Sequence, residues 1–312
     1  MNLPTYAKTR NNSNIEIQLA PQMQQVVSIR NPNGRSPLFC LHPSGGDVGI
    51  YRKLATKLNS DRSVLGIQSR LVCGAKTEHA SLEEMAYSYT RIIERQKPNG
   101  AIRLLGFSLG GFLASLIARN LEESGRHVAF LGLIDSNPGW ILASEKSRGE
   151  LCVRLAQMFE KFQNIGVMKR KPVETVQRDV AILVDTCLSD TPVSSTEIMA
   201  KTTAMGYVPD HQVDSSVLMK FTNTFLTHCR LLRNFQPPEI NCPLSLWWPS
   251  ETEEENRNGT AIWTERAQVT IQESVIEGSH YSIMRGAAVR TLASEVEEAI
   301  ERAETWQNSG SN

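Results

Sequence analysis

The chain has 312 residues, of which 40% are apolar and 21% charged, enough for one large α/β domain or two small ones. The 33 Lys and Arg residues balance the 33 Asp and Glu residues, so no overall field favours nucleic acid or an anionic membrane as a partner. No apolar run approaches the ~18 residues of a membrane span, and the N-terminus lacks the apolar core of a signal peptide.

Residues 1–36 are polar and rich in Asn, Gln, Pro and Ser. We expect them to form a linker or an arm laid on the main domain, in which "QQVVSIR" (24–30) adds a strand. The main domain is expected over residues 37–306. The last residues, "QNSGSN" (307–312), are expected to fray into a flexible tail.

From Pro37 onward, short apolar runs recur at intervals typical of strands: 37–43, 63–69, 102–108, 129–136, 243–250 and 269–278. Helical patterns separate the first four, which is the β-α-β alternation of a parallel sheet. The helix expected over 81–96 begins with Ser81 and has Glu84 three residues later, a capping box. The sequence predicts an α/β fold with a mostly parallel central sheet flanked by helices.

The alternation stops between about residues 139 and 235. This stretch carries helical patterns at 150–163 and 215–235 and no obvious strand. Because the apolar strand runs resume near Cys242, we interpret the stretch as a helical lid inserted into the domain rather than a second domain.

The six cysteines are scattered and contain no C-x-x-C pair. We expect free thiols in a reducing compartment, and hence a cytoplasmic protein. Cysteines and histidines lack the spacing of metal ligands, and neither G-x-G-x-x-G nor a P-loop is present. We therefore expect no metal and no bound cofactor.

Ser108 lies in a glycine-flanked turn between an apolar run and a strong helical pattern. Gly106-Phe107-Ser108-Leu109-Gly110 fits G-x-S-x-G, and a strand before it with a helix after it is the setting of a nucleophile elbow. Glycine at both ends removes side chains that would clash in so sharp a turn. The alternative is a glycine-rich helix start with a capping serine; we favour a nucleophile.

A nucleophilic serine needs a base, and the base needs an orienting carboxylate. His280, in "EGSHYSIMRG", follows the last predicted strand, so its loop can reach back to the top of the sheet. The other histidines are expected in plainer places: His79 and His127 in surface loops, His211 and His228 in the insertion, and His42 as a structural hydrogen bonder.

Two carboxylates compete for the orienting role. Asp135 closes the strand that follows the elbow, where a charged group is costly unless it is paired. Glu251 ends the next strand, in a loop crowded with glutamates, and ranks second.

The loop "LHPSGGDVGIY" (41–51) follows the first core strand and contains three residues that favour a tight turn, Pro43, Gly45 and Gly46. Such a loop can turn the backbone N–H of Ser44 toward the nucleophile, and the N–H of Leu109 would be the second oxyanion donor. An ordinary tight β-α turn explains the glycines equally well.

Three stretches, "PLFCLHPSGGDVGIY", "GFSLGGFLASLIARNLEESGRHVAFLGLIDS" and "GSHYSIM", together resemble the thioesterase domains that end nonribosomal peptide synthetases and polyketide synthases, within the α/β-hydrolase superfamily. The resemblance covers about residues 24–300. It implies Ser108 as nucleophile, Asp135 as acid and His280 as base, with oxyanion donors at Ser44 and Leu109, and a helical lid where this chain has residues 139–235.

The resemblance also implies the substrate and partner: an acyl, peptidyl or polyketide chain held as a thioester on the phosphopantetheine of a carrier protein, and released by hydrolysis or cyclisation. Stand-alone editing thioesterases are similar, but their acid usually lies one strand later. A carboxylesterase acting on free esters and a non-catalytic hydrolase-fold binding module remain as alternatives. Five apolar lid residues could line an acyl pocket, although packing within the lid is the commoner role: Met158, Phe159, Met219, Phe221 and Phe225.

Overall fold

The computed structural model of the chain describes residues 25–30, 35–139, 144–164, 170–189, 195–207 and 215–309. Most of the predicted N-terminal arm, and residues 310–312 of the predicted tail, lie outside these ranges.

Seven strands form one sheet in the order β1-β3-β2-β4-β5-β6-β7. The strands are β1 (Val26–Arg30), β2 (Arg35–Leu41), β3 (Arg62–Ile67), β4 (Ile102–Phe107), β5 (Val128–Ile134), β6 (Leu244–Pro249) and β7 (Ile271–Ile276). Only β1 runs antiparallel to its neighbour, and the other neighbouring pairs are parallel. The predicted mostly parallel sheet is confirmed, with each apolar run lying on a strand.

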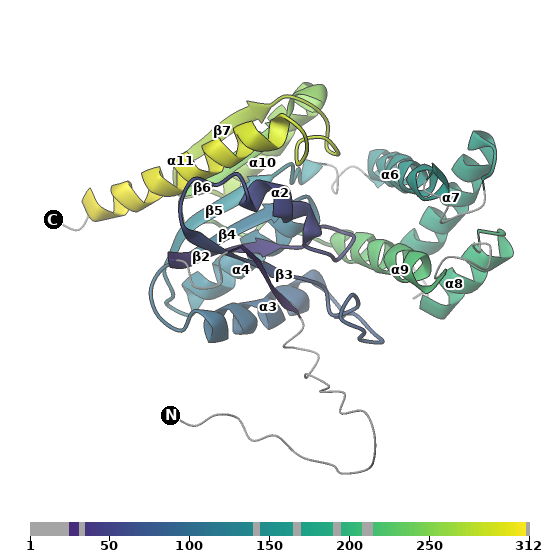
Figure 1. Cartoon of the computed structure of the whole chain (residues 1–312), viewed down its shortest axis with the longest axis horizontal. Helices are drawn as coiled ribbons and strands as arrows, with labels where there is room; N and C mark the ends of the chain where they lie inside the picture. Colours follow the sequence, from purple (N-terminus) through teal and green to yellow (C-terminus); the bar gives the residue numbers. More distant parts are fainter. Residues whose placement is uncertain are drawn as a thin grey trace, which may run out of the picture.

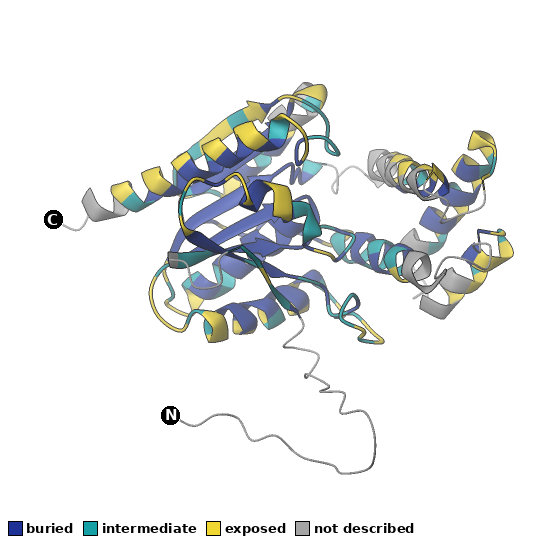
Figure 2. Cartoon of the chain, in the orientation of Figure 1, coloured by how far each residue is buried: buried dark blue, intermediate teal, exposed yellow. Residues whose placement is uncertain are grey.

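Helices cover both faces of the sheet (Figure 1). One layer contains α3 (Leu82–Gln96), α4 (Leu109–Glu123) and α10 (Glu253–Arg266), and the other contains α2 (Arg52–Ala55) and α11 (Ala288–Ser309). Two short 3-10 turns complete the described elements: η1 (Gly49–Tyr51) follows the loop after β2, and η2 (Ser250–Thr252) directly follows β6. The central strands β4 and β5 are buried along their whole length (Figure 2), which explains why their sequences are almost wholly apolar. The exception is Arg103 in β4, whose guanidinium donates to the Glu304 carboxylate at 2.7 Å.

The N-terminus of α3 is capped nearly as its sequence predicts. The Ser81 hydroxyl accepts a hydrogen bond from the Glu84 N–H at 3.1 Å. The Glu84 carboxylate reaches back to the N–H of Ala80 at 2.8 Å, one residue before the cap. This bond still satisfies a backbone donor at the helix start.

The insertion consists of α6 (Ser144–Asn164), α7 (Val173–Leu188), α8 (Ser195–Ala204) and α9 (Ser215–Leu232), with no strand among its described residues. It has a small apolar core of its own, which includes Leu155, Phe159 and Tyr207. In Figure 1, α6, α7 and α8 lie to the right of the sheet, whereas α9 reaches back to the loops at its edge.

The C-terminal helix is longer than expected. α11 continues to Ser309, three residues into the segment predicted as a tail. It ends one residue before Gly310, a residue type that commonly follows a helix end.

Candidate active site at the carboxyl ends of the strands

Ser108 occupies a sharp turn between β4 and α4. Its backbone angles, φ 57° and ψ −125°, are rare for a residue with a side chain, and such strain costs about 1–3 kcal/mol. The Ser108 N–H donates to the carbonyl of Ile134 at 2.9 Å, which ties the turn to the end of β5. The elbow thus has the strained geometry found where surrounding structure holds a functional residue in place.

Glycines make the elbow possible because backbone segments approach one another too closely for a side chain. A Cβ at Gly106 would lie 2.1 Å from the carbonyl oxygen of Gly110, and one at Gly110 would lie 2.2 Å from that of Leu41. The second contact brings the start of α4 against the end of β2. The two glycines of the motif are therefore required by packing as well as by the turn.

Ser136 fixes the elbow from the neighbouring strand end. Its hydroxyl donates to the carbonyl of Ser108 at 2.7 Å, and its own carbonyl accepts from the indole N–H of Trp263 at 2.9 Å. The backbone of Ser108, the predicted nucleophile, is thereby held by the residue that follows Asp135.

Asp135 and His280 are hydrogen bonded. The Asp135 side chain is fully buried at the end of β5, and its N–H donates to the carbonyl of Trp247 at 2.8 Å. Its Oδ2 lies 2.5 Å from Nδ1 of His280, in the loop after β7. The imidazole also stacks on Phe107, the residue before Ser108, with ring centroids 4.7 Å apart and planes 27° apart. The imidazole predicted as the base is thus beside the elbow and hydrogen bonded to the carboxylate predicted as the acid.

Glu251, the second predicted acid, lies in a different setting. It is exposed in η2, and its N–H donates to the carbonyl of Gly278 at 3.1 Å. Of the two carboxylates, the structure brings Asp135 to His280.

The loop of residues 41–51, the proposed oxyanion loop, follows the carboxyl end of β2, as the elbow follows that of β4. No described residue accepts a hydrogen bond from the Ser44 N–H, and Leu109 is the first residue of α4, where a helix leaves its N–H groups without intrahelical partners. Tyr51 joins the two regions: its hydroxyl donates to the carbonyl of Leu41 at 2.7 Å and accepts from the N–H of Phe107 at 2.7 Å.

His42 is a structural hydrogen bonder, as expected. It is fully buried, with Nδ1 donating to the carbonyl of Pro43 at 2.9 Å and Nε2 2.8 Å from the hydroxyl of Tyr89. Burial, followed by the nearby charge of His228, lowers the pKa of His42 to about 3. The ring is therefore neutral at physiological pH.

The expectation for His79 is wrong, because this residue is buried rather than in a surface loop. His228 does belong to the insertion, on α9, but it is fully buried against the sheet domain. Both pair with the Glu78 carboxylate. Its Oε1 lies 2.9 Å from Nδ1 of His79, and its Oε2 lies 3.0 Å from Nε2 of His228. His127 is exposed as expected, and His211 lies outside the described residues.

Glu78 is ionised within this cluster. Burial alone would raise the pKa of its carboxyl, but hydrogen bonds from His228, His79 and Ser69 outweigh burial and hold that pKa well below its ordinary value. The Ser69 hydroxyl donates to it at 2.6 Å. The sequence did not predict this cluster. Its only indication in the sequence is the concentration of polar and ionisable residues in "KTEHAS" (76–81).

The apolar lid residues divide between two roles. Phe159 is buried in the insertion's own core, against Tyr207, and Phe225 packs at the margin of that core. Phe221 instead covers the oxyanion loop, where a Cβ on Gly45 would lie 2.7 Å from its Cε2. The side chains of Met158 and Met219 lie outside the described residues.

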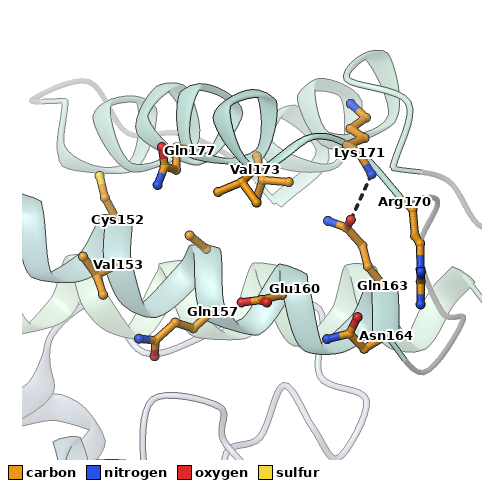
Figure 3. A pocket seen from close by; sticks show the side chains of 12 residues that line it. Cys152, Val153, Gln157, Glu160, Gln163, Asn164, Arg170, Lys171, Val173 and Gln177 are labelled. Carbon is orange, nitrogen blue, oxygen red and sulfur yellow. Dashed lines mark hydrogen bonds between the residues drawn. The ribbon is translucent and has the colours of Figure 1, made fainter.

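A hollow of about 610 Å³ lies between α6 and α7 (Figure 3). Its lining includes Cys152, Glu160 and Lys171, and the backbone N–H of Lys171 donates to the side chain of Gln163 at 2.9 Å. It contains none of the predicted site residues, so it is separate from the elbow.

Over the described ranges, no group of three or more His, Cys, Asp and Glu side chains is arranged to hold a metal ion. No helix in the same ranges combines the length and apolar character needed to cross a membrane. None of the cysteines whose side chains are described forms a disulfide within the described ranges: Cys40, Cys73, Cys152, Cys229 and Cys242.

A family model of the thioesterase domain matches residues 36–300. The chain belongs to the thioesterase domain family. The family assignment confirms the resemblance drawn from the sequence motifs, and the sheet with its helical insertion is an α/β-hydrolase fold.

Relatives of this thioesterase domain are parts of much longer proteins. It is 38% identical over 115 residues to enterobactin synthase component F of Escherichia coli K12, covering 37% of this chain and 9% of that protein. It is 32% identical over 218 residues to a dimodular nonribosomal peptide synthase of Bacillus subtilis, covering 68% of this chain and 8% of that protein. The chain thus spans less than a tenth of the length of either relative.

Among solved structures, the NocB thioesterase domain from the nocardicin cluster superposes with a TM-score of 0.60 at 18% identity. The match covers 89% of this chain and 99% of that domain. At this identity the likeness concerns the fold.

Proposed function

We propose that the protein releases an acyl, peptidyl or polyketide chain from the phosphopantetheine thioester of a carrier protein, through an ester on Ser108. The observation that carries the proposal is the His280–Asp135 hydrogen bond beside the strained elbow of Ser108. Membership of the thioesterase domain family supports the reaction class. The likeness to a dimodular nonribosomal peptide synthase supports a carrier protein or domain as partner.

In the first half-reaction, the Ser108 Oγ attacks the thioester carbonyl while its proton passes to Nε2 of His280. Because Nδ1 donates to Asp135, the neutral ring carries its lone pair on Nε2, and the carboxylate stabilises the imidazolium that forms. The N–H groups of Ser44 and Leu109 hold the tetrahedral oxyanion, each contributing about 3 kcal/mol. The C–S bond then breaks, and His280 returns the proton to the leaving thiol.

In the second half-reaction, His280 takes a proton from water or from a nucleophile within the acyl chain, which attacks the carbonyl carbon of the ester. The bond between that carbon and Ser108 Oγ then breaks, and His280 returns the proton to Ser108 Oγ. Hydrolysis follows in the first case and cyclisation in the second. Exclusion of water from the acyl-enzyme by the insertion decides between these outcomes.

The position of the acid favours a chain-terminating enzyme over an editing thioesterase. Asp135 follows β5, the strand after the elbow, and it is this carboxylate that bonds His280, whereas Glu251 follows β6 and is exposed. We also propose a cytoplasmic location, because free thiols suit a reducing compartment. Phosphopantetheine belongs to the substrate, and the chemistry calls for no cofactor of the enzyme itself.

The test compares two substrates on the same protein. Thiol release from an acyl thioester on a carrier protein is measured beside hydrolysis of a simple aryl ester, with Ser108→Ala as the inactive control. We expect a higher kcat/KM for the carrier thioester. Faster turnover of the aryl ester would favour a carboxylesterase, and failure of a fluorophosphonate to label Ser108 in folded protein would favour a non-catalytic binding module.

A further inference from the structure

The Ser44 N–H is a proposed oxyanion donor. Hydrogen bonds hold the two peptide units on either side of the Ser44 Cα, and the first of these contains that N–H. The first unit contains the Pro43 carbonyl together with the Ser44 N–H, and a peptide unit is planar. That carbonyl accepts from the Gly46 N–H at 2.8 Å and from Nδ1 of His42 at 2.9 Å. Holding the carbonyl fixes the direction of the N–H at the other end of the same unit.

The second peptide unit is held from the insertion. Nδ1 of His228, on α9, donates to the carbonyl of Ser44 at 2.8 Å. Its ring stacks on that of His42, with centroids 4.9 Å apart and planes 24° apart. Phe221, two turns earlier on α9, covers Gly45, so α9 contacts this loop at two places along its length.

Each ring nitrogen of His228 faces a hydrogen-bond acceptor. A backbone carbonyl can only accept, so Nδ1 carries a proton, and Nε2 lies 3.0 Å from Oε2 of the ionised Glu78. The ring is therefore held on both sides, by the Ser44 carbonyl at Nδ1 and by the Glu78 carboxylate at Nε2. Three other groups also face Glu78: the Ser69 hydroxyl at 2.6 Å, the His79 ring at 2.9 Å and the Arg70 guanidinium at 3.9 Å.

We propose that His228, held by Glu78, is a positioning residue that fixes the loop of Ser44, so that α9 of the insertion sets the geometry of the oxyanion hole. His228 touches no reacting atom; it acts through the Ser44 carbonyl. The insertion then has two parts. Helix α9 contacts the loop of Ser44, whereas α6, α7 and α8 lie farther from the sheet (Figure 1). This inference rests on the proposed function of the same site.

Two substitutions of His228 separate its two hydrogen bonds. In His228→Asn, the side-chain amide nitrogen lies near the position of Nδ1 and keeps the bond to Ser44. In His228→Gln, the longer side chain places its amide nitrogen near Nε2 and keeps the bond to Glu78 alone. The readout is the rate at which a fluorophosphonate labels Ser108, because this reaction develops negative charge on the phosphonyl oxygen in the oxyanion hole and needs no thioester substrate.

We expect His228→Asn to label at close to the wild-type rate and His228→Gln to label about tenfold more slowly or worse, since loss of a whole oxyanion donor costs about 10²–10³-fold. With an ester substrate, His228→Gln should lower kcat and leave KM unchanged. Thr222→Val is the matched control, because this buried α9 hydroxyl has no hydrogen-bond partner among the residues that the structure describes. It should label like wild type.

Equal labelling by His228→Gln and wild type, or equal slowing of both His228 variants while thermal unfolding shows them folded, would overturn the inference. Glu78→Gln gives a second test that leaves His228 in place. It replaces the carboxylate that faces Nε2 of His228 with a neutral amide, and we expect slower labelling; a wild-type rate would contradict us. Failure of wild-type protein to label at all would instead count against the proposed function itself.

Discussion

Nδ1 of His280 lies 2.5 Å from Oδ2 of Asp135, although 145 residues separate them in the sequence. Asp135 is fully buried, and the His280 ring is stacked on Phe107, so the imidazole is held in one orientation. Its Nδ1 donates to the carboxylate, and in the proposed mechanism Nε2 acts as the base for Ser108.

Asp135→Asn should therefore nearly abolish turnover. The amide can donate to Nδ1 and so favours the wrong tautomer of His280, and we expect kcat to fall about a thousandfold or more with the fold intact. Steady-state kinetics with circular dichroism would measure both. Glu251→Gln is the control, and its kcat should match wild type; an active Asp135→Asn beside an inactive Glu251→Gln would reverse the assignment of the acid.

Tyr51→Phe should destabilise the protein without changing its apolar packing. The substitution leaves the buried N–H of Phe107 without its acceptor and the Leu41 carbonyl without a donor, at a cost of about 1–3 kcal/mol in the free energy of unfolding. Urea denaturation would measure the loss. Tyr87→Phe, at a tyrosine that is 63% exposed, should change stability by less than about 0.5 kcal/mol. Equal effects of the two substitutions would contradict the bridging role of Tyr51.

Gly110→Ala should lower the free energy of unfolding more than Tyr51→Phe does. The new Cβ would lie 2.2 Å from the Leu41 carbonyl oxygen, and because backbone must move to relieve the clash, we expect a loss of about 3 kcal/mol or failure to fold. Gly149→Ala, in α6 with nothing within 4 Å of the added carbon, should instead stabilise the protein by about 0.5–1 kcal/mol. Thermal unfolding would measure the stability of both variants. A Gly110→Ala protein as stable as wild type would contradict the close approach of Gly110 to the Leu41 carbonyl.

His42 should make stability depend on pH. Its pKa is lowered to about 3 by burial and by the charge of His228, whereas in the unfolded chain it takes up a proton near pH 6.5. Between these values the unfolded state binds more protons, so the free energy of unfolding should fall as pH falls, by up to about 1.4 kcal/mol per pH unit from this residue.

Urea unfolding at several values between pH 4.5 and 7 would measure that slope in wild type and in His42→Asn, which can keep the bond to Pro43. The slope should be shallower in the variant. His127→Gln, at an exposed histidine, should leave the slope unchanged; the same slope in His42→Asn and wild type would exclude His42 as its source.

Local signals made most of the fold predictable. Each buried strand is a short apolar run between turn residues, and Ser81 with Glu84 marks the start of α3. The elbow is equally local, because Gly106, Ser108 and Gly110 lie in five consecutive residues and their spacing alone describes the turn.

The buried Glu78 cluster could not be predicted in the same way. Glu78 and His228 are 150 residues apart, and neither lies in a motif. Their pairing depends on how α9 packs against the loop after β3, which hydrophobic periodicity does not specify. For the same reason His79, in a polar stretch, was expected on the surface: its burial comes from the tertiary fold rather than from its neighbours in sequence.

Intact-mass spectrometry after mixing with an acyl thioester on a carrier protein tests the role of Ser108. We predict that the wild-type protein gains the mass of the acyl group, that fragmentation places it on Ser108, and that Ser108→Ala gains none. Turnover by wild type with no adduct at Ser108 under rapid quenching, together with equal turnover by Ser108→Ala, would contradict an acyl-serine mechanism.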